Sequence, residues 1–159
     1  MTTTANAAYP LETFGPYGAI PNGSGGYQFG DGNLAETDFF ATPAPATATV
    51  TATLTAAQVL NGILLGSPGT SAAAYTLPTV TDLEAALPSA VKVGASFDFS
   101  VINVDGSSSG VITITTNTGW SIGTSGSQGL MTIAATAGTT QAYRARKTGV
   151  GTWALYRIS

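Results

Sequence analysis

The spacing of apolar and polar positions in the second half of the chain predicts short β-strands. Across Ser96–Asn103 the two kinds of side chain alternate, which puts Phe97, Phe99 and Val101 on one face and Asp98 on the other. Glycine-rich turns separate this run from its neighbours, as in an all-β fold. The further strands expected here are Val111–Thr115, Trp120–Ile122, Leu130–Ile133, Gln141–Arg146 and Thr152–Ile158, with Thr148–Gly151 joining the last two as a hairpin.

The region before these strands also contains strand patterns. Thr47–Leu54 alternates with period two and is rich in β-branched residues, so we expect one strand there. Ile63–Leu65 and Ala73–Leu77 are two further short strand candidates, separated by a turn that contains proline and glycine.

Two segments carry the signature of a helix start. Thr55–Gln58 has the spacing of a capping box, in which the two side chains cap each other's backbone N–H groups, and Gly62 provides a stop. Thr81–Leu87 has the same spacing between its threonine and glutamate, and Pro88 ends it. We therefore expect one or two short helices among the strands.

Residues 1–45, here called the arm, have a different character. Prolines and glycines recur too often for a long helix or a central strand. Large apolar side chains nevertheless recur along it, and a simple linker has no use for them. Spaced along an extended chain, they suit docking onto a partner or a neighbouring subunit, or folding back onto the arm's own domain. The candidate docking residues of the arm are Tyr9, Phe14, Tyr17, Ile20, Tyr27, Phe29, Phe39 and Phe40.

Together these patterns predict a mainly β protein in two parts. Residues 1–45 form the extended arm, and residues 46–159 form a compact β domain. The number and spacing of the strands favour an antiparallel β-sandwich or a partly closed barrel with one or two short helices.

The composition excludes several classes of function. Charged residues make up 8% of the chain, whereas soluble domains average about 25%. The chain has no cysteine and no histidine, which excludes thiolate nucleophiles, Ser–His–Asp triads and the common zinc sites. A net charge of −3 argues against nucleic acid as a partner. No run approaches the ~18 consecutive apolar residues of a membrane helix, so we expect no membrane partner.

Two of the carboxylates are candidates for a catalytic pair. A glycosidase places two of them about 5 to 9.5 Å apart across a cleft, and Asp98 on a strand face and Asp105 at a turn could approach each other. A solvated strand face and a turn explain the same two residues. Asp82 and Glu84 fit the first turn of a helix, where they favour its dipole. We expect neither an enzyme nor a cofactor or metal site.

Four of the five cations lie within the last sixteen residues, and four of the eight acids precede residue 40. Alternation puts Arg144 and Arg146 on one face of a strand, with Tyr143 and Ala145 on the other. These cations are either ordinary solvated strand residues or an intersubunit or partner contact. The candidate contact residues are Arg144, Arg146 and Arg157.

Both tryptophans, Trp120 and Trp153, lie in strand-like runs, which favours a place in the core. An exposed position would instead offer an aromatic platform for sugars. Such a platform would favour an alternative function, the binding of a surface glycan.

About two thirds of the chain, Leu54 to Arg157, resembles a family of small structural proteins encoded beside the major capsid gene in marine tailed bacteriophages. The arm lies outside this resemblance. The residues that carry it are Leu54–Gly62, Tyr75–Pro78, Leu87–Pro88, Gly94–Asn103, Arg144–Lys147 and Leu155–Arg157.

The resemblance implies a capsid decoration (cement) protein on the outer surface of the virion, and the candidate docking residues of the arm are then its expected capsid-binding residues. The alternative is a tail or head-fibre module that binds a host surface glycan. The expected partners of the decoration protein are the major capsid protein and itself, as a homotrimer at three-fold and quasi-three-fold sites. The lambda-type decoration protein is similar in architecture alone, since it also combines a compact β domain with an N-terminal segment that orders against the capsid. No binding position is carried over from it.

Overall fold

The structure is a computed structural model that describes residues 42–88, 91–105, 107, 109–122 and 131–159, together with the backbone of two short strands nearer the N-terminus. The chain divides into two units, Met1–Ala41 and Thr42–Ser159. In the first unit, β1 (Ile20–Pro21) pairs antiparallel with β2 (Tyr27–Gln28). The second, here called the compact unit, holds all the other described elements.

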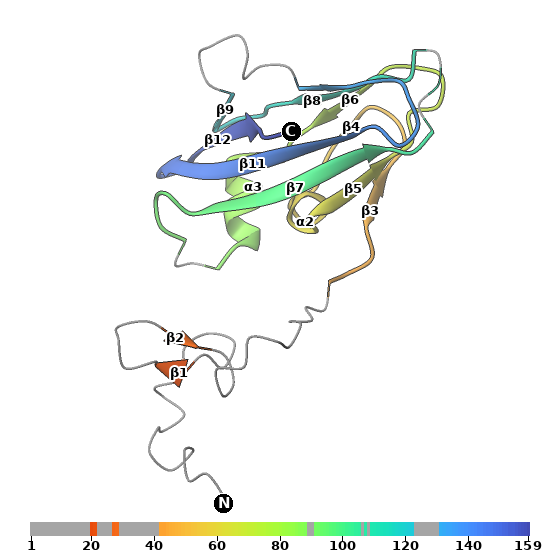
Figure 1. Cartoon of the computed structure of the whole chain (residues 1–159). Coiled ribbons are helices and arrows are strands. Elements are labelled where there is room, and N and C mark those ends of the chain that lie inside the picture. The colour runs from red at the N-terminus through yellow and green to blue at the C-terminus, as the bar shows by residue number, and fades with distance from the viewer. Residues whose placement is uncertain are drawn as a thin grey trace, which may run out of the picture. The chain divides into compact units, whose positions relative to one another are not determined.

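The compact unit contains two β-sheets and two short helices (Figure 1). The six-stranded sheet has the order β3 (Ala46–Ala48), β5 (Ile63–Gly66), β7 (Ser96–Asn103), β11 (Thr140–Gly149), β12 (Thr152–Arg157) and β9 (Trp120–Ser121). The four-stranded sheet has the order β10 (Thr132–Ile133), β8 (Ile112–Thr115), β6 (Ala73–Thr76) and β4 (Ala52–Thr53). The helices are α2 (Ala56–Leu60) and α3 (Val80–Ala86).

Consecutive strands from β3 to β8 alternate between the two sheets. As a result β3, β5 and β7 run parallel in one sheet, and β4, β6 and β8 run parallel in the other. The pairs β7–β11, β11–β12 and β8–β10 are antiparallel, and of these β11–β12 is a hairpin. The predicted mainly β, sandwich-like fold with short helices is confirmed, and its pairing is mixed rather than purely antiparallel. The reason is that the chain leaves one sheet, forms a strand in the other sheet and then returns. The next strand in the first sheet therefore runs in the same direction as the one before it.

The single strand predicted at Thr47–Leu54 is wrong. The segment contains a corner, so that β3 pairs with β5 in the six-stranded sheet and β4 pairs with β6 in the four-stranded one. Ala48 at the end of β3 is buried, whereas Val50 in the corner is 69% exposed. Period-two alternation continues through a corner of extended chain, which is why the pattern did not reveal it.

Both helices begin at a threonine. Thr55 caps α2, and the complete capping box with Gln58 confirms the prediction. The predicted start of the second helix at Thr81 is wrong, because Thr79 is the N-cap and its hydroxyl oxygen accepts the backbone N–H of Asp82 at 3.1 Å. The helix ends before Pro88 as expected.

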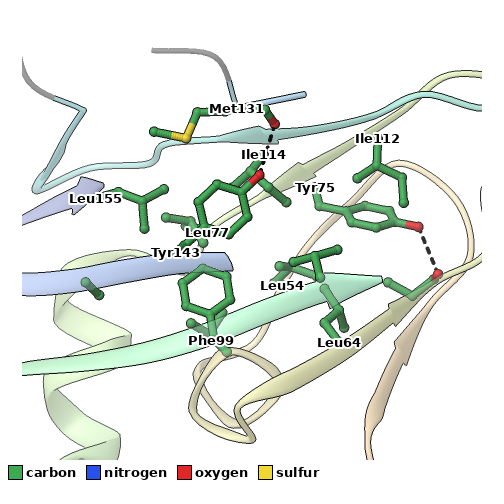
Figure 2. Close-up of a cluster of buried hydrophobic side chains, with 14 of the residues drawn as sticks. Leu54, Leu64, Tyr75, Leu77, Phe99, Ile112, Ile114, Met131, Tyr143 and Leu155 are labelled. Atoms are coloured by element: carbon green, nitrogen blue, oxygen red, sulfur yellow. Dashed lines mark hydrogen bonds between the residues drawn. The ribbon is translucent and has the colours of Figure 1, made fainter. Parts of the chain in front are cut away.

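The core lies between the sheets and is crossed by two tyrosines (Figure 2). Tyr75 of β6 donates from its hydroxyl to the backbone oxygen of Ala48 at 2.9 Å. Tyr143 of β11 donates in the opposite direction to the backbone oxygen of Met131 at 3.4 Å. Val59 of α2 joins the same buried cluster, so the helices contribute to the inner side of the six-stranded sheet.

An aromatic group covers part of the inner face of the six-stranded sheet. Phe99 stacks on Tyr143, with ring centroids 5.3 Å apart. Phe97 contacts both Phe99 and Trp153, and Trp153 contacts Trp120. The predicted alternation of β7 is confirmed, since Phe99 and Val101 are buried inside and Asp98 lies exposed outside.

Candidate functional site

The outer face of the six-stranded sheet, opposite the core, is the candidate binding surface. One row of side chains crosses it at a common register: Ile63 lies beside Ser100, Ser100 beside Ala142, and Ala142 beside Ile158. Ile63 and Ile158 at the two ends of the row are 42% and 45% exposed. Both helices contribute to the core on the inner side, and Figure 1 shows no described element over the outer face.

Neighbouring rows extend this apolar surface. Leu65 lies beside Ile102 on one side of the central row, and Tyr156 lies on the other side, opposite Arg144. All three apolar side chains are partly exposed. We call the following set the outer patch: Ile63, Leu65, Ile102, Ala142, Tyr156 and Ile158.

An ion pair lies in the middle of the outer face. Arg144 donates from Nε and Nη2 to the two carboxylate oxygens of Asp98, each at 2.7 Å, across the β7–β11 pairing. The hydrogen bond from Arg144 holds the pKa of Asp98 below its usual value. The two side chains remain 51% and 47% exposed. Such a two-point contact fixes the direction of both side chains while leaving them accessible to a partner.

The three candidate contact arginines do not share one face. Arg144 and Arg146 lie together on the outer face, as alternation predicted, and Arg146 is placed opposite Ser96. Arg157 lies opposite Tyr143 and therefore has the register of the inner face, at the end of β12. Among the described residues, no ion pair involves Arg146. The outer face thus carries one paired and one available guanidinium.

A second polar cluster joins α3 to the sheet. Glu84 accepts hydrogen bonds from Lys147 Nζ at 2.5 Å and from Trp153 Nε1 at 3.1 Å. The bond from Lys147, followed by that from Trp153, lowers the pKa of Glu84. The expectation that Glu84 lies in the first turn of the helix is wrong, because α3 begins at Val80 and Asp82 is the acid in its first turn. The partners are 63 and 69 residues away in sequence, so no local pattern could have shown them.

The carboxylate pair considered for glycosidase chemistry is not assembled. Asp98 is bound to Arg144, whereas Asp105 accepts from Ser67 Oγ at 2.5 Å and from the backbone N–H of Gly69 at 3.1 Å. The rest of β7 separates the two acids by roughly 20 Å. Asp105 instead holds the turn that follows β5.

The tryptophans lie in or against the core. Trp153 is 1% exposed, which confirms the expected core position. Trp120 is partly buried and donates from Nε1 to the backbone oxygen of Pro78 at 2.8 Å. Trp153 therefore offers no exposed ring to a sugar.

Three further observations concern the described part of the chain. No group of three or more potential ligand side chains that could hold a metal ion occurs there. No helix in it is long and apolar enough to cross a membrane. Of the candidate arm residues, Ile20 and Tyr27 lie in β1 and β2, and the side chains of both are outside the description. The remaining candidates lie outside the described residues: Tyr9, Phe14, Tyr17, Phe29, Phe39 and Phe40.

Comparison of the chain with family models, with curated proteins and with solved structures gave no match.

Proposed function

We propose that this protein is a capsid decoration (cement) protein that binds the assembled head of a tailed phage. It acts as a homotrimer at three-fold and quasi-three-fold sites, on the outer surface of the virion. The observation that carries the proposal is the outer face, where the row from Ile63 to Ile158 lies beside the oriented Asp98–Arg144 pair. The resemblance of Leu54–Arg157 to the phage family gives this surface its proposed context.

The surface suits contact with another protein. Exposed apolar patches mark sites of protein contact, and aromatic residues and arginine are enriched at such interfaces. The described carboxylates have structural partners instead: Glu84 ties α3 to β11, and Asp105 holds a turn. These roles support an activity based on binding.

Stabilisation of a capsid needs no chemistry. A protein that binds the assembled lattice and not its free subunits stabilises the lattice by mass action. In the proposed trimer three arms act together, so that modest contacts by each arm give slow release. An extended arm of ~45 residues reaches up to ~150 Å, enough to cross a boundary between capsid subunits.

Retention on purified capsids tests the role of the arm. Capsids lacking the protein are incubated with the full chain or with a variant that lacks residues 1–40, then sedimented at increasing salt. The variant keeps all described core residues, and we expect it to dissociate at lower salt. A third protein, Val150→Asp, is the control, because Val150 lies exposed in the β11–β12 turn. Equal retention of the truncated and full chains would contradict the arm's role.

A further inference from the structure

The outer patch and the last part of the arm are complementary in composition. Residues 29–41 contain three acids, no cation and four large apolar side chains, Phe29, Leu34, Phe39 and Phe40. The outer face offers aliphatic side chains in register and the guanidinium of Arg146. Charge and apolar character therefore match between this segment and this surface.

The segment has the length that the surface requires. Thirteen residues in extended form span about 43 Å, whereas six strands at ~4.8 Å spacing make a sheet about 24 Å wide. Residues 29–41 can thus cross every strand of the sheet and still retain several residues to connect to β3.

The chain enters the compact unit through a restricted stretch at an edge of the six-stranded sheet. Pro43 and Pro45 restrict the backbone just before β3, and neither proline allows a helical residue in front of it. Asn61 also donates from Nδ2 to the backbone oxygen of Ala44 at 2.9 Å, which fixes the direction of this short stretch. β3 is an edge strand of the six-stranded sheet. The residues before it therefore join the sheet at an edge that a neighbouring copy can approach.

We propose that the outer patch binds residues 29–41 of a second copy of this chain. The arms are then exchanged between neighbouring subunits, with the apolar side chains of the segment on Ile63 and Ile158 and its acids beside Arg146. The inference rests on the proposed homotrimer and adds the contact that holds it together. The first part of the arm, residues 1–26, remains available for the capsid protein.

Disulfide trapping tests this exchange directly, because the chain has no cysteine of its own. Full-length Phe39→Cys is mixed with full-length Ile63→Cys and oxidised, and the products are identified on a non-reducing gel and by peptide mass. We expect the mixed dimer in several-fold excess over that formed by Phe39→Cys with Val150→Cys. Val150 is 94% exposed and lies in a turn away from the patch, so it reports random collision.

A double variant separates exchange from return to the same chain. The double variant Phe39→Cys/Ile63→Cys is oxidised at high dilution. A disulfide within one chain, with no disulfide-linked dimer of two chains, would overturn the proposal in favour of self-docking. No excess over the Val150 control in either experiment would overturn the patch as the site. Binding of the unmodified full chain to capsids is measured separately from both, so that failure of the decoration function and failure of arm exchange can be distinguished.

Sedimentation velocity of the full chain gives a second readout. Arg146→Glu reverses a charge beside the patch, and we expect it to shift the protein from trimer towards monomer at low salt. The shift should diminish at high salt, because screening weakens interactions between exposed charges. Val150→Glu adds a negative charge at a 94% exposed position in a turn away from the patch and is the control for the change in net charge. Equal effects of the two variants would contradict docking of an acidic segment at the outer face.

Discussion

Tyr75 and Tyr143 cross the core in opposite directions, each donating a hydrogen bond from one sheet to the backbone at an edge of the other (Figure 2). Tyr75 reaches Ala48 in the edge strand β3, and Tyr143 reaches Met131 just before the edge strand β10. Burial raises the pKa of both phenols, so both remain protonated donors over the whole neutral range. The pair fixes how the two sheets are placed over each other.

The two phenols should differ in their contribution to stability. Tyr75→Phe removes the 2.9 Å bond, and we expect it to lower the free energy of unfolding by about 1 kcal/mol. Tyr143→Phe removes a bond of 3.4 Å and should cost clearly less. Both acceptor oxygens keep a backbone donor, Ser67 for Ala48 and Ile114 for Met131, so neither variant leaves a buried orphan. Urea unfolding measures the difference, and a larger loss in Tyr143→Phe would contradict this geometry.

The position of the α3 cap can be tested with two neighbouring threonines. Thr79→Ala removes the cap and should cost about 1 kcal/mol. Thr81→Ala alters an exposed helical position and should change the stability by less than about 0.5 kcal/mol. Thermal unfolding of the two variants compares them under the same conditions. If Thr81→Ala were the more damaging change, the helix would begin where the capping-box spacing predicted.

Gly66 is required by close packing. A Cβ at this position would lie 2.5 Å from Ile112 Cδ1 and 3.0 Å from Tyr75 Cε2. Gly66→Ala should therefore destabilise the compact unit by about 1–3 kcal/mol through overpacking. The second change Ile112→Val removes the atom that the new methyl group meets first. In urea unfolding, the double variant should be more stable than the sum of the two single losses predicts, and simple additivity would refute the clash.

The Glu84–Lys147 contact should make stability depend on pH. The folded pKa of Glu84 lies below its unfolded value near 4.5, so the ionised group stabilises the fold above that pH. This stabilisation is lost as the pH falls through the folded pKa. Glu84→Gln should accordingly melt at a lower temperature than the parent at pH 7, and the two melting temperatures should converge under acid conditions. A gap that stays constant down to pH 3 would show that the carboxylate charge is not involved.

The sequence predicted those features that one strand or one turn decides. The bounds of β7 were correct because its alternation is unbroken and its two faces differ sharply, with Phe99 inside and Asp98 outside. The capping box of Thr55 was correct because both partners lie within one helical turn. The corner within Thr47–Leu54 was missed, since the residues on both sides of it are extended and alternate in the same way.

The candidate site was predictable only in part, for the same reason. Alternation within β11 placed Arg144 and Arg146 on one face. The partner of Arg144 lies 46 residues away, and this contact depends on the order of strands in the sheet. The row from Ile63 to Ile158 depends on the register of four segments at once, and no single run of sequence contains that information.

Imaging of labelled virions shows whether this protein decorates a phage head. The full chain carrying a small epitope tag is bound to purified virions and located by low-resolution electron microscopy with an antibody. We expect added density at the three-fold and quasi-three-fold positions of the capsid. Label confined to the tail or to head fibres would contradict a decoration function, and would favour a module that binds the host surface.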